Sequence, residues 1–545
     1  MQGPNRFRDL VWHFFGRFFD KESLSPEGDP EAGVIQTLGI LAAPSGFVAI
    51  LVMPLAFRSW DLVGFRYVFV GLSMIVMGFV MVIEWDALFP DRRDYQVLMP
   101  LPLRLSTLFL AKAAALGIFL AVFLFAVNFF GVLFWPGVDG GTGYLSIIGA
   151  HLTAVVAGGL FSALAIAALQ GVLVTLFHGG VYRRISVAVQ TALMAVLVML
   201  LFLTPMMGLA IGGLAKANSP LLHYFPGFWF AAFYEQLRPA THDLAFRALG
   251  SKAIQALLVA AAIFLLTFLP GYRCHARRVL ETPEPNPKGP GRAWRLVSGA
   301  VDRLLLYDPV EAGVFHFIGQ TITRSVKHRL FLATYGGFGA ALAVMTFASG
   351  GGGSLDFPLM LSFILVSGLR AAFNFPSELS ANWAFQVSET HPVRPYLGGA
   401  RKWIAACAIA PLFLLLAPYE FARFLWPAAL FHLAFGVSTS LLLTEAMFAG
   451  FNKVPFTCGR LPGKVNMTFL AAIYVLGFTM YSRYLARLES WLVVTPWTAI
   501  TFLAIAAAAL AALARRRGRL AGHPAALDYQ EPGDPVVRTL GLSLD

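Results

Sequence analysis

Long apolar runs, separated by short polar segments, occupy most of the chain. Twelve of these runs are candidates for membrane spans, because a helix needs about 20 mostly apolar residues to cross a bilayer. We predict spans at residues 34–57, 64–83, 107–134, 145–177, 185–215, 253–270, 330–348, 357–369, 403–418, 424–448, 465–482 and 491–514. The pattern therefore predicts an all-α polytopic membrane protein with about twelve transmembrane helices.

The first 25 residues carry a different pattern. Charged residues interrupt them, so we expect no cleavable signal peptide here. Apolar residues recur every three or four positions and face a polar side, which is typical of an amphipathic helix lying in the membrane interface. The apolar positions are Phe7, Leu10, Val11, Phe14, Phe15 and Phe18, and the polar ones are Asp9, His13 and Arg17.

Composition and charge agree with a membrane protein. Hydrophobic residues make up 58% and charged residues 13% of the chain, against roughly 45–50% and about 25% in soluble proteins. The net charge is +12, and 32 of the 41 Lys and Arg residues fall on the side of the N-terminus. Since cytoplasmic loops collect basic residues, we predict that both termini are cytoplasmic and that the basic charge does not indicate nucleic-acid binding.

The predicted spans divide into two sets of six. The Pro/Gly-rich stretch at 282–291 has the composition of a linker. We therefore predict a first six-span half at 1–270, a cytoplasmic linker at 271–307, a second half at 308–514 and a cytoplasmic tail at 515–545. Asp308, Pro309 and Glu311 suit a helix start. An amphipathic helix then follows, with Val310, Val314, Phe317, Ile318 and Thr321 on one face.

An internal repeat lies between the second and third spans of each half. The first half reads EWDALFPDRRDYQVL at 84–98, and the second reads NFPSELSANWAFQVSE at 374–389. Each is followed by a Pro-x-Arg turn and by a Lys eight residues after the Arg: Pro102, Arg104 and Lys112, then Pro392, Arg394 and Lys402. Such repeats predict two parallel six-helix bundles.

Recognisable catalytic and ligand-binding motifs are absent from the sequence. There is no HExxH and no GxxxxGK[ST], and the three cysteines lack metal-ligand spacing. We therefore expect no catalytic site, no metal and no cofactor in this chain. Glu445 is the only clear charge predicted inside a span, and Gln170 occupies a similar place; either could line a pathway or be a paired structural group. We interpret His151 and His432 as interfacial polar residues.

Two further segments predict helix contacts. Residues 222–234 are densely aromatic, which indicates either a short helix that caps the bundle outside the membrane or a simple aromatic anchor at the interface. Gly208 and Gly212 have the spacing of closely packed helices.

Residues 84–112 resemble the first cytoplasmic loop of ABC (ATP-binding cassette) type-2 exporter permeases. In that family the loop contains a coupling helix that docks on a separate ATP-binding subunit. The resemblance implies a bacterial inner-membrane permease subunit that is surrounded by lipid and energised by two copies of an ABC ATPase. The fusion of two six-span halves departs from the family, in which many members are half-size and dimerise. ATP would bind that partner. The substrate is not indicated.

The resemblance places coupling helices at 87–97 and 377–387. The residues that would dock on the ATPase are Asp86, Asp91, Arg92, Arg93, Asp94 and Tyr95 in the first loop, and Glu378, Asn382 and Trp383 in the second. The alternative is that both are ordinary solvated loop helices. Alternative functions are a self-contained twelve-span secondary transporter and, with less support from the residues, a membrane-embedded enzyme.

Overall fold

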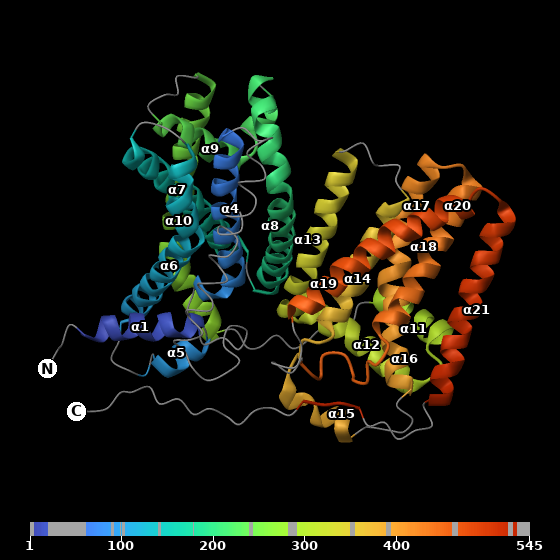
Figure 1. Cartoon of the computed structure of the whole chain (residues 1–545). Coiled ribbons are helices and arrows are strands. Elements are labelled where there is room, and N and C mark those ends of the chain that lie inside the picture. Colours follow the sequence, from blue (N-terminus) through green and yellow to red (C-terminus); the bar gives the residue numbers. More distant parts are fainter. Residues whose placement is uncertain are drawn as a thin grey trace. The chain divides into compact units, whose positions relative to one another are not determined.

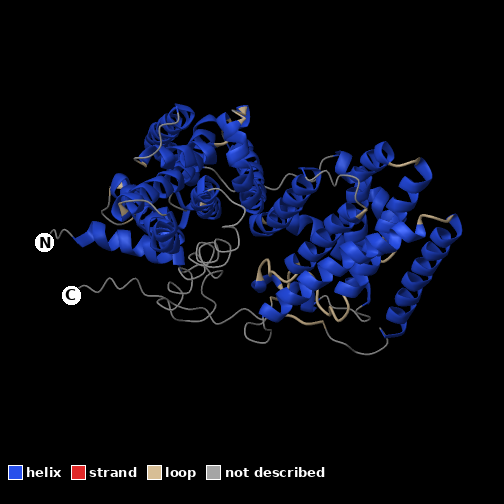
Figure 2. Ribbon diagram, turned by 45° about the horizontal axis from the view of Figure 1, so that its top comes forward, coloured by secondary structure: helices blue, strands red, loops and turns tan. Residues whose placement is uncertain are grey.

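The computed structural model places the chain in two compact units, Met1–Pro287 and Lys288–Asp545. The structure describes residues 5–19, 62–88, 92–98, 100, 104–139, 143–177, 179–217, 219–238, 244–281, 292–348, 355–387, 394–459, 467–520 and 527–530. Within these ranges the chain forms helices joined by loops, and it has no strand (Figures 1 and 2).

Nine helices in the described ranges are long and apolar enough to span a membrane. Each coincides with a predicted span. In the first unit they are α4 (Leu62–Ile83), α6 (Leu105–Asp139), α7 (Tyr144–Leu176), α8 (Gly179–Lys216) and α10 (Leu244–Glu281). In the second unit they are α13 (Val326–Ala348), the continuous α16 (Arg394–Ile404), η5 (Ala405–Ile409) and α17 (Ala410–Arg423), α18 (Trp426–Met447) and α21 (Pro496–Leu520).

Three predicted spans are not among these nine. The span predicted at 34–57 lies outside the described residues. The helix α14 (Asp356–Ala372) covers the eighth predicted span with 17 residues. In the eleventh, α19 (Met467–Thr479) continues through the π-helical turn η6 (Met480–Tyr484) into α20 (Leu485–Leu492). The chain is thus an all-helical, multi-pass membrane protein.

The helix α4 forms the centre of the first unit, because it packs against α6, α7, α8 and α9 (Pro226–Leu237). It is apolar on all sides, as expected for a helix enclosed by others. Its contact with α8 uses the glycine that the sequence indicated: a methyl group at Gly64 would lie 2.5 Å from the carbonyl oxygen of Gly208.

The predicted N-terminal amphipathic helix forms as α1 (Asn5–Phe19) and packs against α6. Val11, Phe14 and Phe18 are buried, and the Phe18 ring stacks on Phe119 with 4.8 Å between centroids. Phe7, which the pattern places on the same face, is exposed. The apolar face of α1 therefore belongs to the core of the first unit.

The second unit contains the equivalent helix, α12 (Pro309–Arg324), which packs against α16. The side chain of Asp308 accepts a 2.8 Å hydrogen bond from the Val310 N–H, so the predicted N-cap is confirmed. The contact with α16 is close, because a methyl group at Gly399 would lie 2.6 Å from the carbonyl oxygen of Glu311.

The loop helices differ from the prediction. The helix predicted at 87–97 is replaced by η2 (Trp85–Leu88) and α5 (Arg92–Leu98). The prediction of one continuous helix at 377–387 is wrong. The segment forms two short helices, η4 (Leu379–Ala381) and α15 (Trp383–Val387), with Asn382 between them. The Asn382 side chain bonds to distant backbone groups, which fixes the chain at this break.

Helices also occupy both ends of the predicted linker. The helix α10 continues to Glu281, and α11 (Arg292–Leu305) precedes α12. Only 282–291, which lies outside the described residues, is left between them. The boundary between the two compact units falls in this stretch.

The aromatic segment of the first unit forms a packed helix. It contains η3 (Pro220–His223) and α9, in which Phe228, Phe230 and Tyr234 are buried. The Trp135 Nε1–H donates a 2.9 Å hydrogen bond to the Tyr234 hydroxyl. Of the two interpretations, the structure supports the short helix packed on the bundle.

The α4–α8 contact yields a stability prediction. Gly64→Ala forces the two helices apart, and we expect it to lower the free energy of unfolding by about 1–3 kcal/mol. The matched control is Gly117→Ala in α6, where a methyl group meets nothing within 4 Å. Thermal unfolding of the purified protein should show a lower Tm for Gly64→Ala only; equal Tm values for both variants would contradict the close contact.

Candidate functional site

Each unit has two opposite ends at which polar contacts gather. Figure 1 shows the amphipathic and loop helices at one end, α1 and α5 in the first unit and α12 and α15 in the second. The short helix before the last span, α9 or α20, lies at the other. We call these the loop end and the distal end of each unit.

At the loop end of the first unit, Asp94 holds three elements together. Its carboxylate is buried, pairs with Arg17 of α1, and accepts from Lys112 Nζ of α6 at 3.1 Å. Lys112 is the Lys of the sequence repeat and is itself buried, with its ammonium 5.6 Å from the centre of the Phe14 ring. Asp94 therefore lies inside a salt-bridge cluster instead of on the exposed surface that docking requires.

The loop end of the second unit contains an equivalent ion pair. Lys402, the repeat Lys of α16, pairs with Glu311 of α12 and donates a 2.8 Å hydrogen bond to the carbonyl oxygen of Leu305. In the second unit the repeat Lys pairs directly with the amphipathic helix, and in the first it pairs with Asp94, which also binds Arg17 of the amphipathic helix. The acid comes from the loop helix in the first unit and from the amphipathic helix in the second.

Asn382 is also part of the interior. It is buried and donates hydrogen bonds to the carbonyl oxygens of Thr457 at 2.6 Å and Gln530 at 2.8 Å. The side chain joins the second loop to segments 451–459 and 527–530. Trp383 and Glu378, the other predicted docking residues of this loop, are exposed.

For most of the remaining predicted docking residues, the structure describes the backbone but not the side chain. Asp86 lies in η2 and Arg92, Arg93 and Tyr95 lie in α5, but their side chains are outside the described part of the structure. Arg104 is exposed before α6, and Arg394 begins α16. Asp91, Pro102 and Pro392 lie outside the described residues.

Both predicted pathway residues have structural contacts. Gln170 is buried and donates to the carbonyl oxygen of Trp85, just after α4, where helix carbonyls need partners. Glu445 lies 3.5 Å from the Nε of Arg401, with both side chains partly buried. The prediction that Glu445 is the only clear charge in a span is wrong, because α4 contains Arg66 and α17 contains Glu420.

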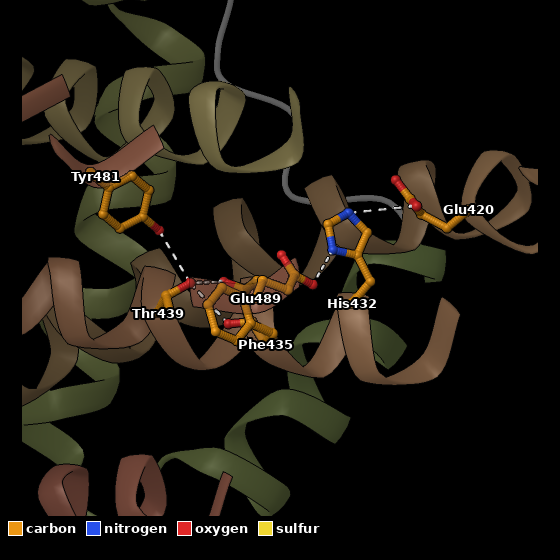
Figure 3. Close-up of polar contacts among 7 residues, drawn as sticks. Glu420, His432, Phe435, Thr439, Tyr481 and Glu489 are labelled. Atoms are coloured by element: carbon orange, nitrogen blue, oxygen red, sulfur yellow. Dashed lines mark hydrogen bonds and ion pairs between the residues drawn. The ribbon is translucent and has the colours of Figure 1, made fainter. Parts of the chain in front are cut away.

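The distal end of the second unit contains a cluster that the sequence analysis missed (Figure 3). Glu420 of α17, His432 of α18 and Glu489 of α20 are all at least 97% buried. His432 Nδ1 forms a close hydrogen bond with Glu489 Oε1, and His432 Nε2 lies 3.6 Å from Glu420 Oε2. We call these three residues the Glu–His–Glu cluster.

The local fold explains this convergence. Glu420 lies in the last turn of α17, and His432 lies in the second turn of α18, after a connection of two residues. The π-helical turn η6 leads into α20 and so supplies Glu489; such turns are frequent at functional sites. It also directs the Tyr481 hydroxyl to within 3.1 Å of Ser362 Oγ and 3.3 Å of Ser440 Oγ.

The first unit has a related arrangement at its distal end. Glu235 of α9 is buried and pairs with the buried Arg66 of α4. His151, in the second turn of α7, is fully buried, and neither of its ring nitrogens has a hydrogen-bond partner among the described residues. His151 and His432 occupy corresponding helices, and both side chains are buried inside the protein instead of lying on its surface. The repeated order of His and Glu was the sequence signal that could have revealed these sites.

The geometry of the Glu–His–Glu cluster suits protons better than metal ions. The two carboxylates face opposite nitrogens of one imidazole, so they do not converge on a single point. In the described part of the chain, no three His, Cys, Asp or Glu side chains have metal-binding geometry. Burial raises the pKa of the Glu489 carboxyl, against the opposing effect of its hydrogen bond with His432.

Known proteins provide no match to this chain: no protein-family model, no curated protein and no solved structure matches it. Its function is therefore inferred from its own residues.

The Asp94 tie yields a stability prediction. Asp94→Asn leaves the buried Lys112 ammonium without a carboxylate, so it should destabilise the first unit by about 1–3 kcal/mol. Adding Lys112→Gln should recover part of this loss, with a coupling energy of about 0.5–3 kcal/mol. Denaturant unfolding of the single and double variants measures the coupling. Additive effects would mean that the two side chains do not interact.

Proposed function

We propose that the chain is the membrane-spanning permease subunit of an ABC transporter, an exporter by its resemblance. In this proposal two six-span halves are fused in one chain, and a separate ATPase binds ATP and docks at the loop ends. The observation that carries the proposal is that each repeat Lys forms an ion pair at the loop end of its unit, Lys112 with Asp94 of the loop helix and Lys402 with Glu311 of the amphipathic helix.

The ties support transmission of force. Nucleotide-driven movement would occur outside the membrane and must bias two arrangements of the helices inside it. A loop that was only solvated would bend without moving the spans. The buried Asp94 and Asn382 side chains instead hold each loop against the rest of its unit, and rigid contacts of this kind carry coupling.

The loop end of each unit carries its own exposed apolar side chains, which are available for docking. Val97 at the end of α5, and Trp383 and Val387 in α15, are 55%, 64% and 80% exposed although they lie outside the candidate spans. Large aromatic anchors dominate the energetics of protein interfaces. We assign Trp383 the main anchoring role in the second unit, with the exposed Glu378 in the same loop.

The second candidate function is a self-contained secondary transporter. The observation that favours it is the charge buried within or beside the spans, Arg66 with Glu235 and the Glu–His–Glu cluster, because ion-coupled carriers use such groups. ATP dependence separates the two functions. Transport by the reconstituted chain alone, driven by an ion gradient, would favour the carrier.

The proposed location is a bacterial inner membrane with both termini cytoplasmic. We therefore expect topology reporters inserted at Gly140, Gly227 or Gly351 to be exterior, and those at Gly289 or at the C-terminus to be cytoplasmic. The physical reason is the uneven distribution of Lys and Arg between the two sides. A reporter at Gly289 that is exterior would reverse the proposed orientation.

The docking surface yields a prediction about coupling. When the chain is reconstituted with an ABC ATPase encoded near its gene, Trp383→Ala should reduce stimulation of ATP hydrolysis at least tenfold, since a truncated hot-spot aromatic costs about 2 kcal/mol or more. The matched control is Trp491→Ala, which has a similar exposed fraction of 65% but follows Glu489 in α20 at the distal end. Equal stimulation of the wild type and both variants would contradict docking through Trp383.

A further inference from the structure

The Glu–His–Glu cluster has an imbalance of charge that its surroundings do not correct. In water at pH 7, two Glu side chains are ionised and a His is mostly neutral, for a net charge of −2. All three side chains are buried here, and burial disfavours an uncompensated charge strongly. The cluster therefore needs either a neighbouring cation or additional protons.

No neighbouring side chain in the described structure supplies the cation. Arg423, Arg483 and Arg487 are exposed, and Arg487 lies over the Tyr484 ring. The other ionisable groups on the surrounding elements are Asp356, at the start of α14, Tyr419, which packs on Phe347 and Phe357, and Tyr481, which bonds to hydroxyl groups. None of these three is cationic.

The arrangement of atoms accommodates added protons. An imidazolium carries an N–H at both nitrogens, and His432 has one carboxyl group at each. Glu489 accepts the Nδ1–H in a close hydrogen bond. Glu420 Oε2 and His432 Nε2, 3.6 Å apart, have no hydrogen-bond partner among the described residues. Two carboxyl groups beside one imidazolium reach zero net charge when one of them is protonated.

We propose that Glu420, His432 and Glu489 form a proton-binding site that holds two more protons than the same side chains hold in water at pH 7. The site contains one imidazolium, one carboxylate and one carboxylic acid, and the geometry favours Glu420 as the acid. Because Glu489 belongs to α20, the bound protons help to hold this helix on the bundle.

The first unit shows what distinguishes this site. There the Glu of the corresponding short helix, Glu235, faces Arg66, which stays charged at all accessible pH values. Raising the pH therefore does not remove the cation from the contact in the first unit. In the second unit, raising the pH removes a proton, leaves a net charge of −1, and weakens the docking of α20. This inference does not depend on whether ATP or an ion gradient drives transport.

Infrared spectroscopy of the purified full chain tests the proton count directly. At neutral pH we expect a C=O stretch from one buried carboxylic acid. Glu420→Gln and Glu489→Gln should each abolish it, because one carboxyl then remains to pair with the imidazolium. His432→Gln should double the band, since both carboxyls then lack a cation. The matched control, Glu235→Gln, should leave the band unchanged.

Hydrogen–deuterium exchange tests the link to α20. Between about pH 6 and about pH 9, after correction for intrinsic exchange rates, protection of residues 485–492 should fall up to tenfold per pH unit. Protection of 226–237 in α9 should stay constant. Glu420→Gln replaces the carboxylic acid by a neutral amide and leaves one imidazolium paired with one carboxylate, so it should keep 485–492 protected.

Each of the two measurements has a result that would contradict the inference. A carboxylic-acid band that survives both Glu420→Gln and Glu489→Gln, or no such band in the wild type, would overturn the proton-binding site. Protection of 485–492 that is equally independent of pH in the wild type and in Glu420→Gln would overturn the link to α20. Either result leaves ATPase docking at the loop ends untouched, so the failure of this inference is distinguishable from failure of the proposed function.

Discussion

A charge that is removed from water must be matched by a partner, and for Asp94, Arg66 and Glu489 in this chain the partner comes from a different helix. Backbone groups satisfy each other within a membrane helix, so they do not decide how helices are arranged. The buried charges do: Asp94 joins α1, α5 and α6, Arg66 joins α4 to α9, and the Glu–His–Glu cluster joins α17, α18 and α20. Apolar packing fills the space between these fixed points.

The sequence predicts the parts of this structure that depend on local pattern. Apolar run length located nine helices that the structure supports as spans, and the N-cap at Asp308 follows from its neighbours alone. The partners of buried charges do not follow in the same way. Glu420 and Glu489 lie just outside the predicted runs, where acids are normally solvated, and Glu489 is 57 residues from His432 along the chain. Only the packing of the helices shows that both are enclosed.

The two units have polar contacts at similar positions but with different residues. At the loop ends the Lys is retained, and the acid moves from Asp94 of the loop helix to Glu311 of the amphipathic helix. At the distal ends the Glu is retained, and its partner changes from Arg66 to His432. What the two units share is therefore a polar contact between helices at each end, and several combinations of residues can form that contact.

The change of partner at the distal ends has a functional consequence. An arginine side chain is not deprotonated at accessible pH, so Arg66 keeps the positive charge that faces Glu235. In the second unit the partner is a histidine between two carboxyl groups, and in the proposed proton-binding site this contact depends on the bound protons. The two units of this chain can therefore carry different partners at their distal ends, an arginine in the first and a histidine in the second.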